Sequence, residues 1–193
     1  MQKNIVARWQ SWSGDGLEHL VVRQSDSSVV ADGVVLAGEG SALFAVRYTL
    51  ECDSRWTLRE AAIEITGEER KIAIVSSGRG EWRDGQGKAL PHLDGAIDID
   101  LSVSPFTNTL PIRRLGLEKG QSGDILAAYV RFPELEITTD PQRYTCLDPM
   151  RRYRYESLDS DFVRDIEVDP DGLVVTYPGL FRRTAGSQPV LSR

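Results

Sequence analysis

Apolar and polar residues alternate along most of the chain, with the period of two that an extended strand produces. In residues 58–66, the apolar side chains of Ala61, Ile63 and Ile65 alternate with the acids Glu60 and Glu64. The alternation resumes in residues 71–75, after a polar break at residues 67–69. These two segments predict a β-hairpin with a short polar loop.

A second hairpin is predicted between residues 162–168 and 173–177. The connecting residues, from Asp169 to Gly172, read DPDG. Pro170 fixes φ where a type I turn needs it, and Gly172 tolerates the positive φ that follows. Turn chemistry and strand pattern therefore agree here.

Further strands are expected at residues 5–12, 17–24, 28–37, 42–52, 80–83, 96–103, 124–132, 135–138 and 151–156. Turn-forming residues separate most of these segments, and no apolar stripe with helical spacing runs for more than about three turns. Many short strands without long helices predict an all-β fold, an antiparallel sandwich or barrel.

The segment from Asp98 to Leu115, DIDLSVSPFTNTLPIRRL, begins as a strand and then departs from the alternation. Pro105 has no N–H to donate to a sheet, and the Thr-Asn-Thr cluster after it bonds readily to its own backbone. We expect a corner or a short helical turn that crosses one end of a barrel. A corner at the rim of a cavity would aim Asn108, Arg113 and Arg114 at a polar ligand group.

Length and charge narrow the class of protein. The 193 residues are expected to form one domain, residues 1–184, followed by a C-terminal tail at residues 185–193. No apolar run approaches the ~20 residues that span a bilayer, and the first residues lack the apolar core of a signal peptide. We therefore expect a cytoplasmic protein. The formal charge of −6 argues against nucleic-acid binding, which requires a basic face.

The sequence carries no strong catalytic or metal-binding motif. Cys52 and Cys146 are too few and too far apart to indicate a disulfide framework or a zinc site, so both are expected to be reduced. His19 and His92 lack the context of a catalytic triad. We therefore assign no catalytic residue, no metal and no cofactor.

Asp98 and Asp100 form the strongest acid pair. On a strand they share one face, with Cβ atoms ~7 Å apart. Paired carboxylates at such separations serve glycoside hydrolysis, and Asp94 would complete a candidate metal site. Because Ile97 and Ile99 supply the buried face, the simpler interpretation is that both acids lie on the solvent face.

Several segments carry a family resemblance. They are Arg8-Trp9 with residues 16–20 (GLEHL), 48–56 (YTLECDSRW), 78–82 (GRGEW), 93–100 (LDGAIDID) with the stretch that follows, 142–145 (QRYT) and 171–183 (DGLVVTYPGLFRR). The chain resembles a bacterial family, formerly of unknown function, labelled "putative glycolipid-binding". Where that family often has cysteine, this chain has Ala96, which counts against an essential thiol.

The resemblance implies a fold and a ligand. The fold is a single antiparallel, strongly curved sheet that closes into a roughly spherical β-barrel with little helix, similar to the carriers of the bacterial lipoprotein-localisation pathway. The ligand is a glycolipid or another amphiphilic small molecule.

Arginines next to aromatic residues are frequent in the second half of the chain. A buried guanidinium is costly unless it is paired. Its partner is either an acid of the protein, with Asp98, Asp100 and Glu118 as candidates, or a ligand phosphate or carboxylate. We predict that a polar grip on the ligand is formed by Arg113, Arg114, Arg131, Arg143, Tyr144, Asn108 and Tyr155.

Three functions remain open. The first is a non-catalytic binding module with an apolar, hollow interior. Burying a chain of about twelve carbons contributes ~9–10 kcal/mol, much of which association costs cancel, so the ligand must also have a polar head. The second is a hydrolase-like enzyme acting on a sugar-bearing metabolite through Asp98, Asp100 or His19. The third is a protein-interaction module that docks through a strand edge and Trp9–Trp12.

The four tryptophans also have two possible roles. They could stack on sugar rings at the rim of a cavity, although such residues more often fill a core. They are Trp9, Trp12, Trp56 and Trp82.

Overall fold

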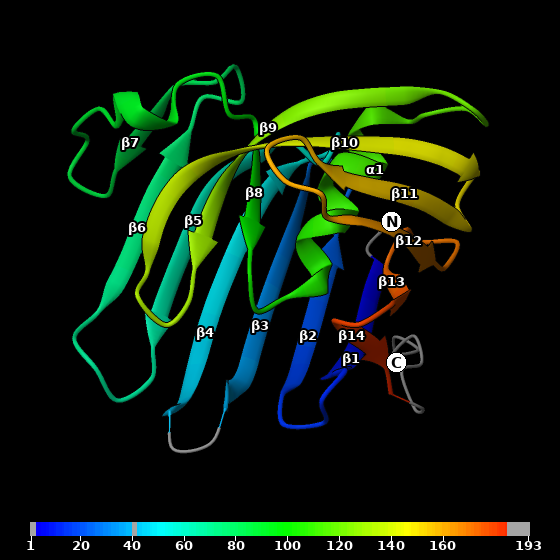
Figure 1. Cartoon of the computed structure of the whole chain (residues 1–193). Helices are drawn as coiled ribbons and strands as arrows, with labels where there is room; N and C mark the ends of the chain where they lie inside the picture. Colours follow the sequence, from blue (N-terminus) through cyan, green and yellow to red (C-terminus); the bar gives the residue numbers. More distant parts are fainter. Residues whose placement is uncertain (1–2, 40–41, 185–193) are drawn as a thin grey trace.

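One sheet of fourteen strands makes up most of the computed structural model, which describes residues 3–39 and 42–184 (Figure 1). The predicted tail at residues 185–193 lies outside the described residues. The strands are β1 (Lys3–Ser11), β2 (Leu17–Gln24), β3 (Ser28–Glu39), β4 (Ala42–Asp53), β5 (Leu58–Ile65), β6 (Lys71–Ser76), β7 (Trp82–Asp84), β8 (Asp98–Leu101), β9 (Ser122–Arg131), β10 (Glu136–Asp148), β11 (Arg152–Ser157), β12 (Val163–Val168), β13 (Val174–Tyr177) and β14 (Phe181–Arg183).

The strand order is β7-β6-β5-β4-β3-β2-β1-β14-β13-β12-β11-β10-β9-β8. Two meanders, β1–β7 and β9–β14, meet where β1 pairs with β14, and β8 adds to β9 as the one parallel neighbour in this order. The expected all-β fold with a single, mainly antiparallel sheet is confirmed. Both predicted hairpins are present, as β5–β6 and β12–β13.

The two ends of the sheet, β7 and β8, are not joined by a strand ladder. Loop contacts connect them instead. The Gly95 N–H donates to the Gly80 carbonyl at 2.8 Å, and Trp82 Nε1 donates to the Ala96 carbonyl at 2.8 Å. A Cβ on Gly80 would lie 2.9 Å from the Cα of Gly95, so this close backbone approach requires glycine. The sheet is strongly curved, but its hydrogen-bonded ladder is open.

Residues 105–115 lie inside the curve of the sheet, as a 3₁₀ segment η2 (Pro105–Asn108) followed by helix α1 (Thr109–Leu115) (Figure 1). The Phe106 N–H donates to Ser104 Oγ at the start, and Gly116 ends α1 in the left-handed conformation. Phe106 and Leu110 are fully buried. The expected short helical turn is therefore present, but it fills part of the interior that we expected to be hollow.

The prediction that Asp98 and Asp100 lie on a solvent face was wrong. Asp98 is 1% exposed, and Asp100 is partly buried beneath η2. Because η2 and α1 cover β8, both faces of this short strand are enclosed. Three of the four tryptophans fill the core, and only Trp12 among them is exposed, at 46%.

Strand lengths differ most from expectation at β10. The sequence indicated only residues 135–138, whereas β10 runs from Glu136 to Asp148. Pro141 and its polar neighbours interrupt the alternation of apolar and polar residues, but pairing with β9 is continuous from Glu136 to Thr145. β8 is conversely shorter than the expected 96–103, because the chain leaves the sheet after Leu101.

Candidate functional site

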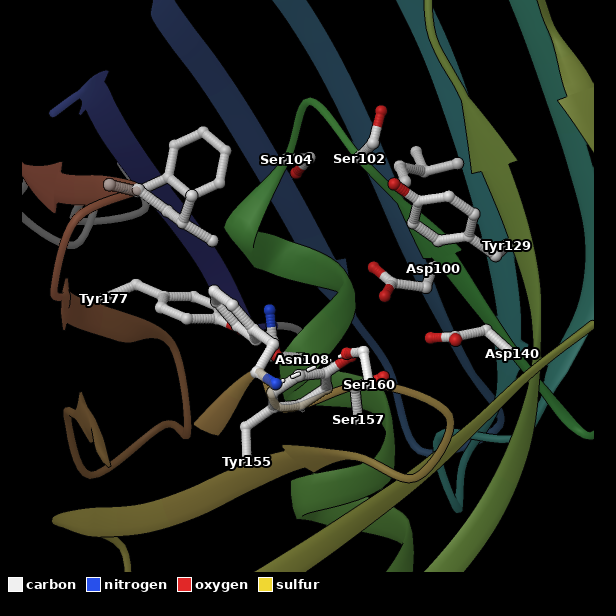
Figure 2. Close-up of a pocket in the computed structure, with 14 residues that line it drawn as sticks. Asp100, Ser102, Ser104, Asn108, Tyr129, Asp140, Tyr155, Ser157, Ser160 and Tyr177 are labelled. Carbon is white, nitrogen blue, oxygen red and sulfur yellow. Dashed lines mark hydrogen bonds between the residues drawn. The ribbon is translucent and has the colours of Figure 1, made fainter. Parts of the chain in front are cut away.

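A cavity of about 410 Å³ opens between η2 and strands β8–β11, and we call it the polar cavity (Figure 2). Most of its lining side chains are acids, hydroxyls or aromatic rings. They are Asp100, Leu101, Ser102, Ser104, Asn108, Tyr129, Asp140, Tyr155, Ser157, Ser160, Phe162, Tyr177, Leu180 and Phe181.

Two carboxyl groups form one side of the polar cavity. Gln142, buried at 1% exposure, donates from Nε2 to Asp100 Oδ2 at 2.8 Å and to Asp140 Oδ2 at 2.7 Å. Asp100 Oδ1 also accepts from Thr107 Oγ1 at 2.9 Å. Burial raises the pKa of Asp100 and of Asp140, although the hydrogen bonds from Thr107 and Gln142, and from Tyr155 to Asp140, act in the opposite direction.

Aromatic rings face the carboxyl groups across the cavity. Figure 2 shows Tyr155, Asn108 and Tyr177 on the side opposite Asp100 and Asp140. The Tyr155 ring centroid lies 6.2 Å from that of Tyr177. Such rings present apolar faces on which the C–H side of a sugar can rest.

A second cavity, of about 250 Å³, is predominantly apolar, and we call it the apolar cavity. It shares Ser102 and Phe181 with the polar cavity, so the two are adjacent. It is lined by Trp9, Ser11, Gly16, Leu17, Glu18, Val35, Leu36, Ala37, Gly38, Phe44, Ser102, Val103, Phe132 and Phe181.

Glu18 lies where the two cavities meet. Its Oε1 accepts from Tyr48 Oη and, at 2.8 Å, from Ser104 Oγ, which lines the polar cavity. Its Oε2 has no hydrogen-bond partner among the described residues. Burial at 2% exposure raises the pKa of Glu18 from 4.5 to about 7, and the two hydrogen bonds oppose that rise.

Replacing Glu18 with Gln is expected to remove one component of the pH dependence of stability. Between pH 4.5 and 7 the folded protein keeps the Glu18 proton that the unfolded chain has lost, so the free energy of unfolding falls as pH rises. The shift corresponds to about 3 kcal/mol at most. Urea unfolding from pH 4 to 8 should show the difference between Glu18→Gln and wild type growing across that window. A constant difference would contradict the assignment.

The predicted site residues are placed in different parts of the molecule. Asn108 and Tyr155 line the polar cavity, and the buried Tyr144 donates to Asn108 Oδ1 at 2.9 Å from behind it. Arg113 and Arg114 line another cavity, of about 590 Å³, near the C-terminal end of α1. There Arg113 stacks over the Trp56 ring, with its guanidinium carbon 5.2 Å from the centroid.

Three of the four predicted arginines form ion pairs with acids of the protein. Arg114 makes a two-pronged bond to Asp98, with Nε–Oδ1 at 3.0 Å and Nη2–Oδ2 at 2.5 Å. On the surface, Arg131 pairs with acids at 134 and 136 and Arg143 with Asp124. The four predicted arginines therefore do not converge on one cavity, and Arg114 has the internal acid partner that we considered.

The alternative catalytic groups do not converge either. His19 lies on the outer face of β2, where its Nδ1 accepts from Arg8 Nε at 3.1 Å, and Asp98 is bound to Arg114. Within the described residues, no group of three or more His, Cys, Asp or Glu side chains is arranged to hold a metal ion. Cys52 and Cys146 are buried and free.

Sequence reasoning missed Glu18, Tyr129, Asp140, Gln142 and Tyr177. Glu18 carried a usable signal, because it shares a strand face with the core residues Leu20 and Val22 and is an acid in a buried register. Asp140 and Gln142 had no such signal, since the strand that carries them was not recognised.

The fold and its cavities define an all-β protein in which a curved sheet surrounds a short helix and two adjoining cavities of small-molecule size. The sequence profile of the family described as "Putative glycolipid-binding" matches residues 6–183, and the chain belongs to this family. A crystal structure of a DUF1089-family protein from Pseudomonas aeruginosa is similar, with 44% identity, a TM-score of 0.79 and coverage of 91% of this chain and 92% of that one. No curated protein matches the chain.

The described residues contain no helix with both the length and the apolar character that a membrane-spanning segment requires.

Proposed function

We propose that this protein binds one amphiphile of the glycolipid type, with the polar head in the polar cavity and the hydrocarbon chain in the apolar cavity. The observation that carries this proposal is the shared wall of the two cavities at Ser102 and Phe181. Of the residues predicted from sequence, Asn108 and Tyr155 belong to the proposed site, and Tyr144 supports it from behind.

The size of the apolar cavity sets the scale of the chain. At about 30 Å³ per group, the share of a water molecule in the liquid and a rough size for a methylene, the cavity holds roughly eight carbons. Burying roughly eight methylenes contributes ~6 kcal/mol, while association costs on the order of 4–15 kcal/mol. Contacts to the head must therefore supply the remaining affinity.

A glycosidase is the second candidate, because Asp100 and Asp140 face one sugar-sized cavity. Asp100 Oδ2 and Asp140 Oδ2 lie 2.8 and 2.7 Å from the same Gln142 nitrogen, so at most about 5.5 Å separates the two oxygens. Retaining glycosidases use carboxyl pairs about 5–5.5 Å apart. Such enzymes, however, need one acid and one ionised nucleophile. Here burial raises the pKa of both carboxyl groups in the same direction and does not set an acid apart from a nucleophile, which supports binding over hydrolysis.

The two buried free thiols fit a reducing compartment, and we place the protein in the bacterial cytoplasm on that ground.

Filling the apolar cavity is expected to weaken binding of long-chain ligands. In calorimetric titrations of alkyl glucosides below their micelle concentrations, wild-type affinity should rise with chain length and level off near eight carbons. Ala37 lines the cavity, and Ala37→Phe should lower octyl glucoside affinity about tenfold or more. The reason is that the Phe side chain would fill the volume that the alkyl chain of the ligand occupies.

Ala42→Phe is the matched control, because Ala42 is exposed and does not line the cavity. Equal loss in both variants, or no dependence on chain length, would contradict the proposed chain site. Release of glucose during the titration, abolished by Asp100→Asn, would instead favour the glycosidase.

A further inference from the structure

The polar cavity is lined by acidic side chains and by no basic ones among the described residues. Among the described residues that line it, Asp100 and Asp140 are the only charged side chains, and Lys, Arg and His do not occur. The arginines that we predicted for the polar grip lie elsewhere, in ion pairs or against Trp56. The ionisable groups that face the ligand head therefore include acids and no bases, so any charge that the protein presents there is negative.

The two carboxyl groups are held in place by the protein. Gln142 spans them with one amide nitrogen, and Thr107 fixes the other oxygen of Asp100. An ionised carboxylate only accepts hydrogen bonds, and each of its oxygens has room for more than one. The cavity thus presents oriented acceptors, and donors on a ligand satisfy them.

The hydroxyl groups of a sugar and the ammonium group of an amino sugar are such donors. A phosphate or a uronic acid would place a negative charge beside two acids in a partly enclosed site, where like charges are poorly screened. The aromatic faces of Tyr155 and Tyr177 lie opposite, where the C–H side of a sugar ring can rest while its hydroxyls reach the acids.

We infer that the head group is a neutral or amino sugar whose donors bind Asp100 and Asp140, and that anionic head groups are rejected. This inference rests on the proposed function. It replaces the arginines of the predicted polar grip with two acids.

Three octyl glycosides with the same chain test this inference. They are octyl glucoside, octyl 2-amino-2-deoxyglucoside and octyl glucuronide, titrated calorimetrically at pH 7. We expect the amino sugar to bind at least as tightly as the glucoside, and the glucuronide at least tenfold more weakly. The amino-sugar preference arises because an ammonium group favours the ionised form of both carboxyl groups.

Asp140→Asn is expected to reduce the discrimination between the amino sugar and the glucuronide about tenfold, because Asn keeps one acceptor but removes the charge. Asp161→Asn is the control, since Asp161 is exposed, lies outside the cavity and changes the net charge equally. Asp100→Asn provides a second test, and thermal unfolding verifies that each variant is folded.

The outcomes separate the two proposals. If none of the three glycosides binds, the proposed function fails. If they bind but the glucuronide equals the glucoside, or Asp140→Asn and Asp161→Asn behave alike, the charge inference fails and the proposed function survives.

Discussion

Replacing Arg114 with Met is expected to destabilise the protein by about 3–5 kcal/mol. The substitution leaves Asp98 without its partner while the carboxyl group stays buried at 1% exposure. Burial raises the pKa of Asp98 although Arg114 lowers it, so an ionised Asp98 without Arg114 is unfavourable in the folded protein. Urea unfolding at pH 7 measures the loss.

Arg143→Met is the matched control for Arg114→Met. Arg143 makes the same two-pronged contact, with Asp124, but both side chains are about half exposed. Water solvates the remaining Asp124, so the expected cost is below about 1 kcal/mol. The double variant Asp98→Asn/Arg114→Met should regain part of the lost stability, because it buries no charge. Similar costs for the two arginines would show that the internal pair is unimportant.

Replacing Gly33 with Ala is expected to cost about 3 kcal/mol or more, which is at or beyond the usual range for overpacking. Gly33 lies opposite Tyr48 in the β3–β4 register, and the Tyr48 ring crosses directly over it. An added Cβ would overlap the ring, which is 1% exposed and cannot move outward. Displacing it would also break the hydrogen bond from Tyr48 to Glu18.

A double-mutant cycle with Tyr48→Leu tests whether the Tyr48 ring causes the expected cost of Gly33→Ala. In Tyr48→Leu protein the ring is absent, so adding Ala at position 33 should cost less than about 1 kcal/mol. Thermal or urea unfolding of the four proteins in this cycle gives the coupling between the two positions. An equal cost in both backgrounds would mean that the Tyr48 ring is not the constraint.

The strands and their turns were predictable because they depend on local patterning. Alternation of residues in β5 and β6 places their apolar side chains on one face, whatever the rest of the chain does. The turn from Asp169 to Gly172 is equally local, since Asp169 Oδ1 accepts from the backbone N–H groups of Asp171 and Leu173. Most of β10 was not predicted, because its register is maintained by pairing with β9 and not by its own residue pattern.

The candidate site was less predictable, because the role of an ionisable side chain depends on its partner. Arg114 and Asp98 are sixteen residues apart, and Arg143 meets Asp124 only through the β9–β10 register. Nothing in the sequence near these arginines indicates whether an acid of the protein or a ligand lies opposite. The arginine grip was therefore an expectation based on residue type alone.

By itself, the sequence determined that this protein is an all-β chain with defined hairpins, because strand periodicity and turn geometry act over a few residues. Only the tertiary structure decided that residues 105–115 lie inside the sheet, that β8 is covered on both faces, and that the polar and apolar cavities adjoin at Ser102 and Phe181. These features depend on sheet curvature and on contacts between distant segments, which no local pattern specifies.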